Sequence, residues 1–168
     1  MMVLLLRAFG KLPRRVRRTL VRLGSPKYTV GAICIIERDD GAFLFVRHTY
    51  WKSWGTAGGL AKRREPPEQA AVRETLEEVN LPIELVGEPA VVVDPRLHRV
   101  DVVFLARPAA GADLDRVRPS SPEIEALGWF ARHELPLMQA ETISALRALE
   151  RMGAIDLTGV ELRPGHRR

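Results

Sequence analysis

Three glutamates lie within five residues of the chain, at Glu74, Glu77 and Glu78. The surrounding residues 66–80 are strong helix formers, and spacings of three and four residues bring side chains together on one surface of a helix. Like charges placed this way destabilise a helix unless cations offset them, and Arg73 is the only basic residue within it. Clustered carboxylate oxygens suit Mg²⁺ or Mn²⁺. The segment therefore predicts a divalent-metal site, with an acidic solvated surface as the alternative.

The spacing of these residues favours the metal site. From Gly59 to Leu81 the sequence fits the pattern G-x5-E-x7-R-E-U-x-E-E-x-G-U, where U is an aliphatic residue. This pattern is the Nudix box, and residues 28–150 resemble the Nudix (MutT-like) hydrolases. Thr75 and Asn80 depart from it, but Thr75 can still pack on the sheet and Asn80 tolerates the backbone of a helix end. The matched Gly, Glu and Arg positions are Gly59, Glu65, Arg73, Glu74, Glu77 and Glu78.

The resemblance implies hydrolysis of a nucleoside diphosphate linked to another moiety, such as ADP-ribose, a nucleotide sugar or an oxidised dNTP. Water would attack phosphorus with the assistance of Mg²⁺ or Mn²⁺. Arg73 would orient a box glutamate through a charge-assisted hydrogen bond, and Glu65 would support the loop. The implied metal ligands are the backbone carbonyl of Gly58 and the carboxylates of Glu74, Glu77 and Glu78.

The resemblance does not fix the general base. Residues 108–122 form a long loop rich in Pro, Gly and Asp, and Glu123 lies at its end, six residues before Trp129. This place is similar to that of an additional metal-binding or catalytic glutamate in family members. Box residue Glu74 is the other candidate, and Glu125 is a third. Exposed acids at a strand edge are the alternative interpretation of Glu123 and Glu125.

Cations and tryptophans flank the glycine loop that leads into the box. We expect Arg47 and Arg64 near phosphate oxygens, with plain solvation as the alternative. Trp51 and Trp54 are expected to stack on a base, although packing within the domain explains them equally well. Cys34 lies in an apolar strand and is interpreted as a buried packing residue.

The elements that hold these residues predict an α+β fold with a mixed sheet and helices packed against it. The resemblance implies that this fold is a Nudix-type α/β/α sandwich with the box helix packed on the sheet. Residues 28–38 and 42–48 are rich in β-branched and aromatic residues and flank Asp-Asp-Gly, which predicts a β-hairpin. A last helix is expected from Glu141 to Met152. Four further strands are expected at 83–87, 90–94, 99–108 and 125–130. On the box helix, the residues expected to share one side away from the glutamates are Val72, Thr75, Leu76 and Val79.

Basic residues gather at the amino end. Residues 1–27 hold eight Lys or Arg and no acid, whereas the rest of the chain holds 18 basic and 21 acidic residues. Val16, Leu20 and Leu23 recur at helical spacing among the arginines, which predicts a basic amphipathic helix. A solvated helix laid on the domain surface is the favoured interpretation. Contact with nucleic acid, anionic lipid or a partner is left open, and so is a non-catalytic nucleotide-sensing module that uses this arm.

Three segments are expected: a basic arm at 1–27, a Nudix hydrolase domain at 28–155 and a tail at 156–168. The single cysteine excludes an intrachain disulfide and favours a reducing compartment. The longest apolar run, Met1 to Leu6, is too short to span a membrane, so a cytoplasmic location is expected. The sequence does not identify which nucleoside diphosphate derivative is the substrate. It also leaves open whether the protein is a homodimer.

Overall fold

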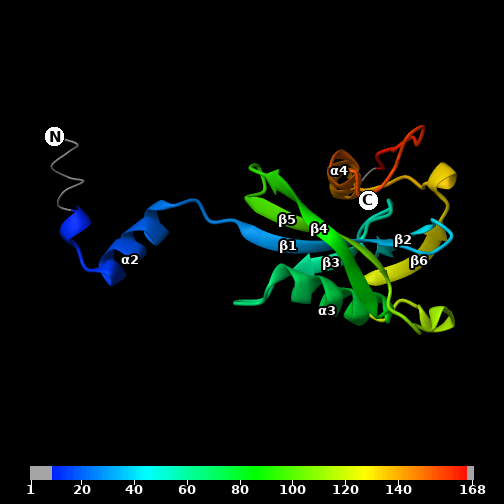
Figure 1. Ribbon diagram of the computed structural model, residues 1–168, viewed down its shortest axis with the longest axis horizontal. Helices are drawn as coiled ribbons and strands as arrows, with labels where there is room; N and C mark the ends of the chain where they lie inside the picture. The colour runs from blue at the N-terminus through cyan, green and yellow to red at the C-terminus, as the bar shows by residue number, and fades with distance from the viewer. Residues whose placement is uncertain (1–8, 166–168) are drawn as a thin grey trace.

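The computed structural model describes residues 9–165, so the apolar run Met1 to Leu6 and the last three residues of the expected tail lie outside the described residues. A six-stranded mixed sheet forms the centre of the molecule (Figure 1). The strands are β1 Thr29–Glu37, β2 Phe43–His48, β3 Ala57–Leu60, β4 Ile83–Asp94, β5 Arg99–Pro108 and β6 Ile124–Phe130. Their order is β4-β5-β1-β2-β6, with β3 beside β1. Only β1 and β5 pair in parallel among these strands.

One helix packs on each face of the sheet, so the α/β/α sandwich expected from the sequence is confirmed. Helix α3 (Pro67–Val79) covers one face and α4 (Ala140–Arg151) covers the other (Figure 1). Because successive side chains of a strand point to opposite faces, β1 serves both cores. Its Ile35 packs on the side of α4, whereas Cys34 and Ile36 pack on the side of α3. Burial on both faces explains the continuous apolar run in this strand.

Strand β1 has two different neighbours on the side away from β5. Residues 31–34 pair with β3, and residues 36–37 pair with β2, which confirms the expected hairpin. Strand β3 was not expected, since its sequence Ala-Gly-Gly-Leu lacks the β-branched and aromatic residues typical of strands. Four strands were expected after the box, but the structure has three there. Residues 83–87 and 90–94 belong to the single strand β4, whose pairing with β5 shifts register between Val86 and Ala90.

The box helix forms as expected, but it turns a different face to the sheet. Pro66 and Pro67 suit its first turn, and Asn80 ends it in the left-handed conformation at φ 55°. The buried residues are Ala70, Ala71, Thr75, Glu78 and Val79. Val72 and Leu76 are exposed. At 100° per residue the buried face is rotated by about 90° from the one expected. Alanines form this face because the helix packs closely on a glycine-containing strand.

The carboxyl-terminal residues pack on the domain. Helix α4 confirms the expected last helix, and its Leu146 and Leu149 are fully buried. Leu157, in the segment expected as a tail, is 2% exposed and belongs to the same core. Met138 donates its N–H to the carbonyl of Arg163 at 2.9 Å. The proposed boundary at residue 155 stays a prediction, since packing continues beyond it.

The basic amphipathic helix is present as α2 (Arg14–Gly24), but its expected place on the domain surface is not what the structure shows. Helix α2 lies apart from the sheet, to which residues 25–28 connect it (Figure 1). None of its residues is buried. Among residues 9–165, no helix has the length and apolar character needed to cross a membrane.

Candidate active site

Two consecutive glycines allow α3 to approach the sheet. Gly58 has φ 143°, and a Cβ there would lie 2.3 Å from the backbone oxygen of Ala32. A Cβ on Gly59 would lie 2.6 Å from the carboxyl carbon of Glu74. Real Cβ atoms do not make contacts this short. Position 58 therefore requires glycine, because the clash is with backbone, whereas a Cβ at position 59 would displace the carboxylate of Glu74. The glycine strand therefore places backbone atoms, without side chains, against the glutamates of α3.

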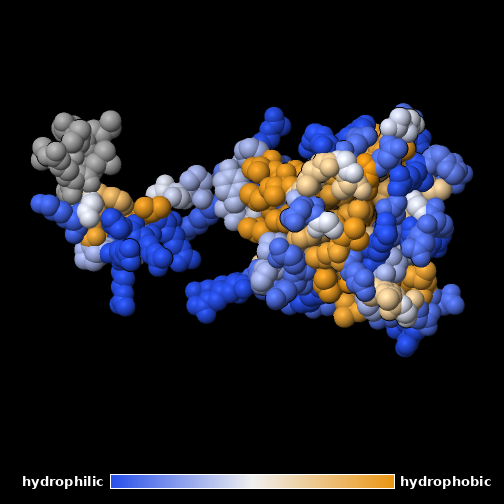
Figure 2. Space-filling model, in the orientation of Figure 1, coloured by the Kyte–Doolittle hydropathy of each residue, from blue (hydrophilic) through white to orange (hydrophobic). Residues whose placement is uncertain are grey.

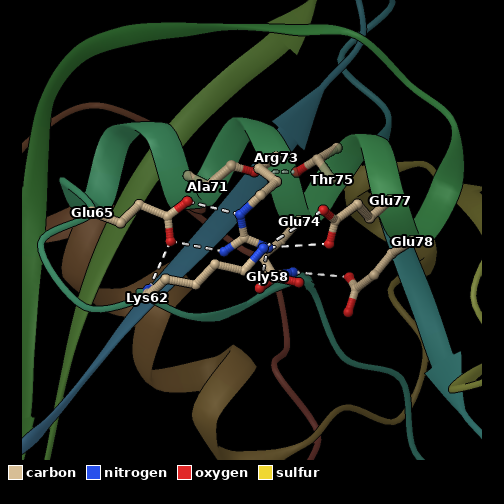
Figure 3. A network of polar contacts seen from close by, with 9 residues as sticks. All are labelled: Gly58, Lys62, Glu65, Ala71, Arg73, Glu74, Thr75, Glu77 and Glu78. Atoms are coloured by element: carbon tan, nitrogen blue, oxygen red, sulfur yellow. Dashed lines mark hydrogen bonds and ion pairs between the residues drawn. The ribbon is translucent and has the colours of Figure 1, made fainter.

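Glu78 points from α3 toward the sheet and is only 7% exposed. Its Oε2 accepts a hydrogen bond from the N–H of Gly58 at 3.0 Å (Figure 3). Burial raises the pKa of Glu78 to about 7; the Gly58 hydrogen bond opposes this, and the negative charges of Glu74, Glu123 and Glu77 add to it. Near neutral pH this carboxylate is therefore poised between its protonated and ionised forms.

Arg73 holds the acidic residues of the box in place (Figure 3). Its guanidinium donates two hydrogen bonds to Glu65, at 2.7 and 2.9 Å. The same group donates to Glu74 at 2.8 Å and to Glu77 at 3.1 Å. Glu65 also accepts the N–H of Lys62 at 2.7 Å, and its bonds to Arg73 lower its pKa to about 2. Arg73 thus fixes the orientation of Glu74, and Glu65 ties the preceding loop to the helix.

A cleft of about 610 Å³ opens above the glycine strand. It brings together six of the residues singled out from the sequence, namely Gly58, Gly59, Glu74, Glu78, Glu123 and Trp51. The cleft is more polar than apolar, as a site for a charged ligand should be. Its remaining lining residues are Ile33, His48, Tyr50, Thr56, Leu60, Leu97, Arg99, Gln139, Glu141 and Thr142.

Glu123 reaches the cleft from the end of the long loop. Its backbone oxygen accepts the N–H of Thr49 at 2.9 Å, which ties the loop to the end of β2. Its charge acts on Glu78 and also on His48, whose pKa is lowered mainly by burial, with Glu123 opposing. Glu125 instead lies 3.5 Å from Arg47 and is not among the cleft residues. Of these two glutamates, Glu123 in the loop is the one placed beside the box, whereas Glu125 belongs to β6.

Four other residues expected at the site do not line the cleft. Glu77 lies outside it with its side chain 55% exposed, paired with Arg73. Arg47 stacks over the ring of Trp54 at 5.5 Å. Trp54 itself packs against a phenylalanine of β6 in the core beneath α4. Arg64 lies in the loop before α3, beside a separate hollow. This placement gives no support to substrate contacts by Arg47, Trp54 or Arg64, which stay untested predictions.

Several cleft residues were missed by sequence reasoning. Arg99 is the clearest case: its Nε donates to Asp101 at 2.7 Å, and Asp101 is buried. A charged residue in an otherwise apolar strand needs a partner, and a residue two positions away lies on the same face. That signal in 99–108 could have singled out Arg99. Tyr50 and Glu141 carried no comparable signal, since tertiary packing alone brings them to the cleft.

The donors in the cleft fit a divalent cation. Carboxylate oxygens of Glu74 and Glu78 and the backbone of Gly58 share one cavity. The pKa of Glu78 is raised first by burial, and the neighbouring negative charges of Glu74, Glu123 and Glu77 add to the rise. Within residues 9–165, no three His, Cys, Asp or Glu side chains converge closely enough to form a complete metal cage. Mg²⁺ does not require one, because it commonly binds through one or two carboxylates together with waters and substrate phosphates.

Comparisons with known proteins agree with this geometry. The family model described as NUDIX domain matches residues 27–151. A MutT-like protein of Streptomyces ambofaciens is 28% identical over 138 residues, which span 82% of this chain and 84% of that protein. The crystal structure of a MutT NUDIX hydrolase from Burkholderia pseudomallei is 30% identical, with a TM-score of 0.59 over 73% of this chain and 98% of the other. An ADP-ribose pyrophosphatase from Streptococcus suis shares the fold at 22% identity and a TM-score of 0.59, over 84% and 100% of the two chains.

The sandwich fold and its acidic cleft, together with these similarities, define a hydrolase that acts on phosphoric anhydride bonds. This finding favours an enzyme over the non-catalytic module left open by the sequence. The chain belongs to the Nudix family, among its MutT-like members.

Proposed function

We propose that the protein is a Mg²⁺- or Mn²⁺-dependent pyrophosphohydrolase that cleaves a nucleoside diphosphate linked to another moiety. One observation carries the proposal: the buried carboxylate of Glu78 accepts the Gly58 N–H in the same cleft as Glu74 and Glu123. Three acids around one cavity repel one another unless a cation and a phosphate chain occupy it. Proteins of similar structure include an ADP-ribose pyrophosphatase and a UDP-X diphosphatase, so they support the diphosphate linkage without selecting the second moiety.

The proposed ligands of the metal are Glu74, Glu78 and the backbone carbonyl of Gly58, with Glu77 contributing from outside the cleft. When bound, the ion neutralises phosphate charge and lowers the pKa of the attacking water. Arg73 serves as a positioning residue, because its bond to Glu74 and its two bonds to Glu65 fix one glutamate relative to the loop. A carboxylate fixed in this way needs little reorganisation when a phosphate enters.

For the general base we propose Glu123. One oxygen of Glu74 is already occupied by Arg73 at 2.8 Å, which leaves that carboxylate better suited to ligation than to proton transfer. Glu125 lies near Arg47, away from the cleft lining. Glu123 lines the cleft beside the box glutamates and is held by the backbone bond to Thr49. In this role its carboxylate would accept the proton of the water that attacks phosphorus.

On the substrate side we propose contacts from three cleft residues. Trp51 offers an aromatic surface on which a base can stack. Arg99 is oriented by Asp101 through its Nε, which leaves its terminal nitrogens to meet an anionic group. Glu141 has a buried Oε2 without a hydrogen-bond partner among the described residues, so it is suited to accept an N–H or O–H of the ligand.

The experiment is a panel assay with purified protein. ADP-ribose, a dinucleotide, a nucleotide sugar and an oxidised dNTP are each incubated with Mg²⁺ or Mn²⁺, and released mononucleotide or phosphate is measured. Glu78→Gln is expected to lose activity by at least about 100-fold, whereas Glu68→Gln, an exposed glutamate on the same helix, should retain it. Lack of turnover of every compound, or equal activity of the two variants, would refute the proposal.

A further inference from the structure

Helix α2 presents two exposed faces of different chemistry, and neither belongs to the hydrolase site. At 100° per residue, Val16, Leu20 and Leu23 fall within an arc of about 60°. These three side chains are 42%, 46% and 73% exposed. The opposite arc holds only cations and Val21, and no acidic residue occurs in residues 1–27. The cations are Arg14, Arg15, Arg17, Arg18 and Arg22.

Among residues 9–165, the aliphatic row stays exposed, and on the other face Phe9 lies beside the arginines, with which it lines a hollow. Figure 1 shows α2 away from the sheet, and Figure 2 shows apolar and hydrophilic side chains together on its surface. No salt bridge joins an arginine of α2 to an acid among residues 9–165. An exposed aliphatic row costs free energy in water, and an unpaired row of arginines attracts anions. An occupant of this surface therefore has to be both apolar and negatively charged.

We propose that α2 binds the surface of an anionic phospholipid bilayer. A helix lying in the bilayer interface buries its aliphatic row in the acyl boundary while its arginines remain among the headgroup phosphates. Nucleic acid would neutralise the arginines but leave the aliphatic row in water, and α2 has no aromatic residue to stack on bases. The sequence immediately before the helix adds further apolar residues, including Phe9 and the run Met1 to Leu6.

The connection to the sheet limits where the enzyme would then act. Residues 25–28 join α2 to β1, and four extended residues span at most about 14 Å. The hydrolase domain would remain beside the bilayer surface while keeping its own cleft, because none of the α2 residues contributes to that cleft. Binding to lipid and hydrolysis are therefore separable by mutation.

The test is co-sedimentation of the full chain with vesicles of phosphatidylcholine alone or enriched in phosphatidylglycerol. The unaltered chain is expected to bind only the anionic vesicles, and less strongly in high salt. Replacing the five arginines of α2 by Gln should weaken partition by at least about 100-fold. Replacing Val16, Leu20 and Leu23 by Ser should weaken it by at least about tenfold while leaving the charge unchanged.

Matched controls lie on the hydrolase domain. Replacing the exposed Arg96, Arg107 and Arg151 by Gln is the control for loss of charge. Replacing the exposed Val91 and Val93 by Ser is the control for loss of apolar surface. These variants should keep both binding and hydrolysis, and the α2 variants should keep hydrolysis because α2 has no buried residue.

Three results would overturn the lipid proposal. The first is no difference between the two kinds of vesicle. The second is lipid-independent binding to RNA or DNA that survives the Ser substitutions, which would assign the arginines to nucleic acid. The third is a dimer in sedimentation velocity that the Ser substitutions dissociate, because it would assign the aliphatic row to a second copy of the chain.

Discussion

Replacing Glu78 by Gln is expected to stabilise the metal-free protein at alkaline pH. The pKa of Glu78 rises from 4.5 to about 7 in the folded chain, chiefly through burial. The folded state therefore holds this proton more tightly than the unfolded state does. Its contribution to the unfolding free energy is complete below pH 4.5 and is lost as pH rises through about 7. At about 1.4 kcal/mol per tenfold change in proton affinity, the loss is about 3 kcal/mol.

Gln carries no charge at any pH, and its side-chain oxygen can still accept the Gly58 N–H. At about pH 8 the variant should unfold roughly 6–12 °C above the unaltered protein, since about 1 kcal/mol corresponds to 2–4 °C at this size. Near pH 4.5 the two proteins should melt together. The assay is thermal unfolding followed by circular dichroism in the presence of a chelator, across this pH range.

Glu68→Gln is the matched control, because Glu68 is exposed on the same helix. It should melt like the unaltered protein at every pH. Adding Mg²⁺ at about pH 8 should then stabilise the unaltered protein and not Glu78→Gln, since a ligand that binds only the folded state raises its stability. A Glu78→Gln variant that is no more stable than the unaltered protein at alkaline pH would show that this carboxylate is not strained by burial.

Three further outcomes follow from the same geometry. Gly58→Ala should lower the unfolding free energy, measured by denaturant titration, by about 3 kcal/mol or more, because the added Cβ clashes with backbone and φ is 143°. Gly87 has φ 67° but lies in open space, so Gly87→Ala should lower the unfolding free energy by only about 1 kcal/mol. In steady-state kinetics, Glu74→Gln should reduce kcat by at least about 100-fold and Glu77→Gln by less than about tenfold, since only Glu74 lines the cleft; equal losses would contradict this assignment. Burial raises the pKa of the Cys34 thiol to about 12, so it should react with a thiol reagent only after denaturation, and rapid native labelling would show an accessible site.

The sequence predicted best what depends on local chemistry. The box spacing singled out Glu74 and Glu78, which line one cleft, and Arg73, which binds Glu74. Asn80 takes the left-handed cap as expected. Loop position singled out Glu123, whose charge acts on Glu78 of the box, while its catalytic role stays a prediction. These features follow from residue type and short-range spacing, which tertiary packing left unchanged.

Packing decided what the sequence could not. Hydrophobicity assigned Val72 and Leu76 to the core, yet the buried face of α3 carries alanines and Glu78 instead. Close approach to a glycine strand outweighed side-chain hydropathy there. Strand β3 was missed because its glycines lack strand propensity and are held by pairing with β1. The pairing of Arg99 with Asp101 could be read from the local sequence, but its place in the cleft depends on the long-range parallel pairing of β1 with β5.

The contact between α3 and the glycine strand also limits how this enzyme can be redesigned. Gly58, Gly59, Ala70 and Ala71 leave almost no free volume between helix and sheet. Mutant libraries that enlarge these positions would displace the helix, and with it Glu74 and Glu78, before any change in substrate preference could be measured. Useful diversity should therefore be sought elsewhere in the cleft, at positions such as Tyr50, whose side chain is already exposed.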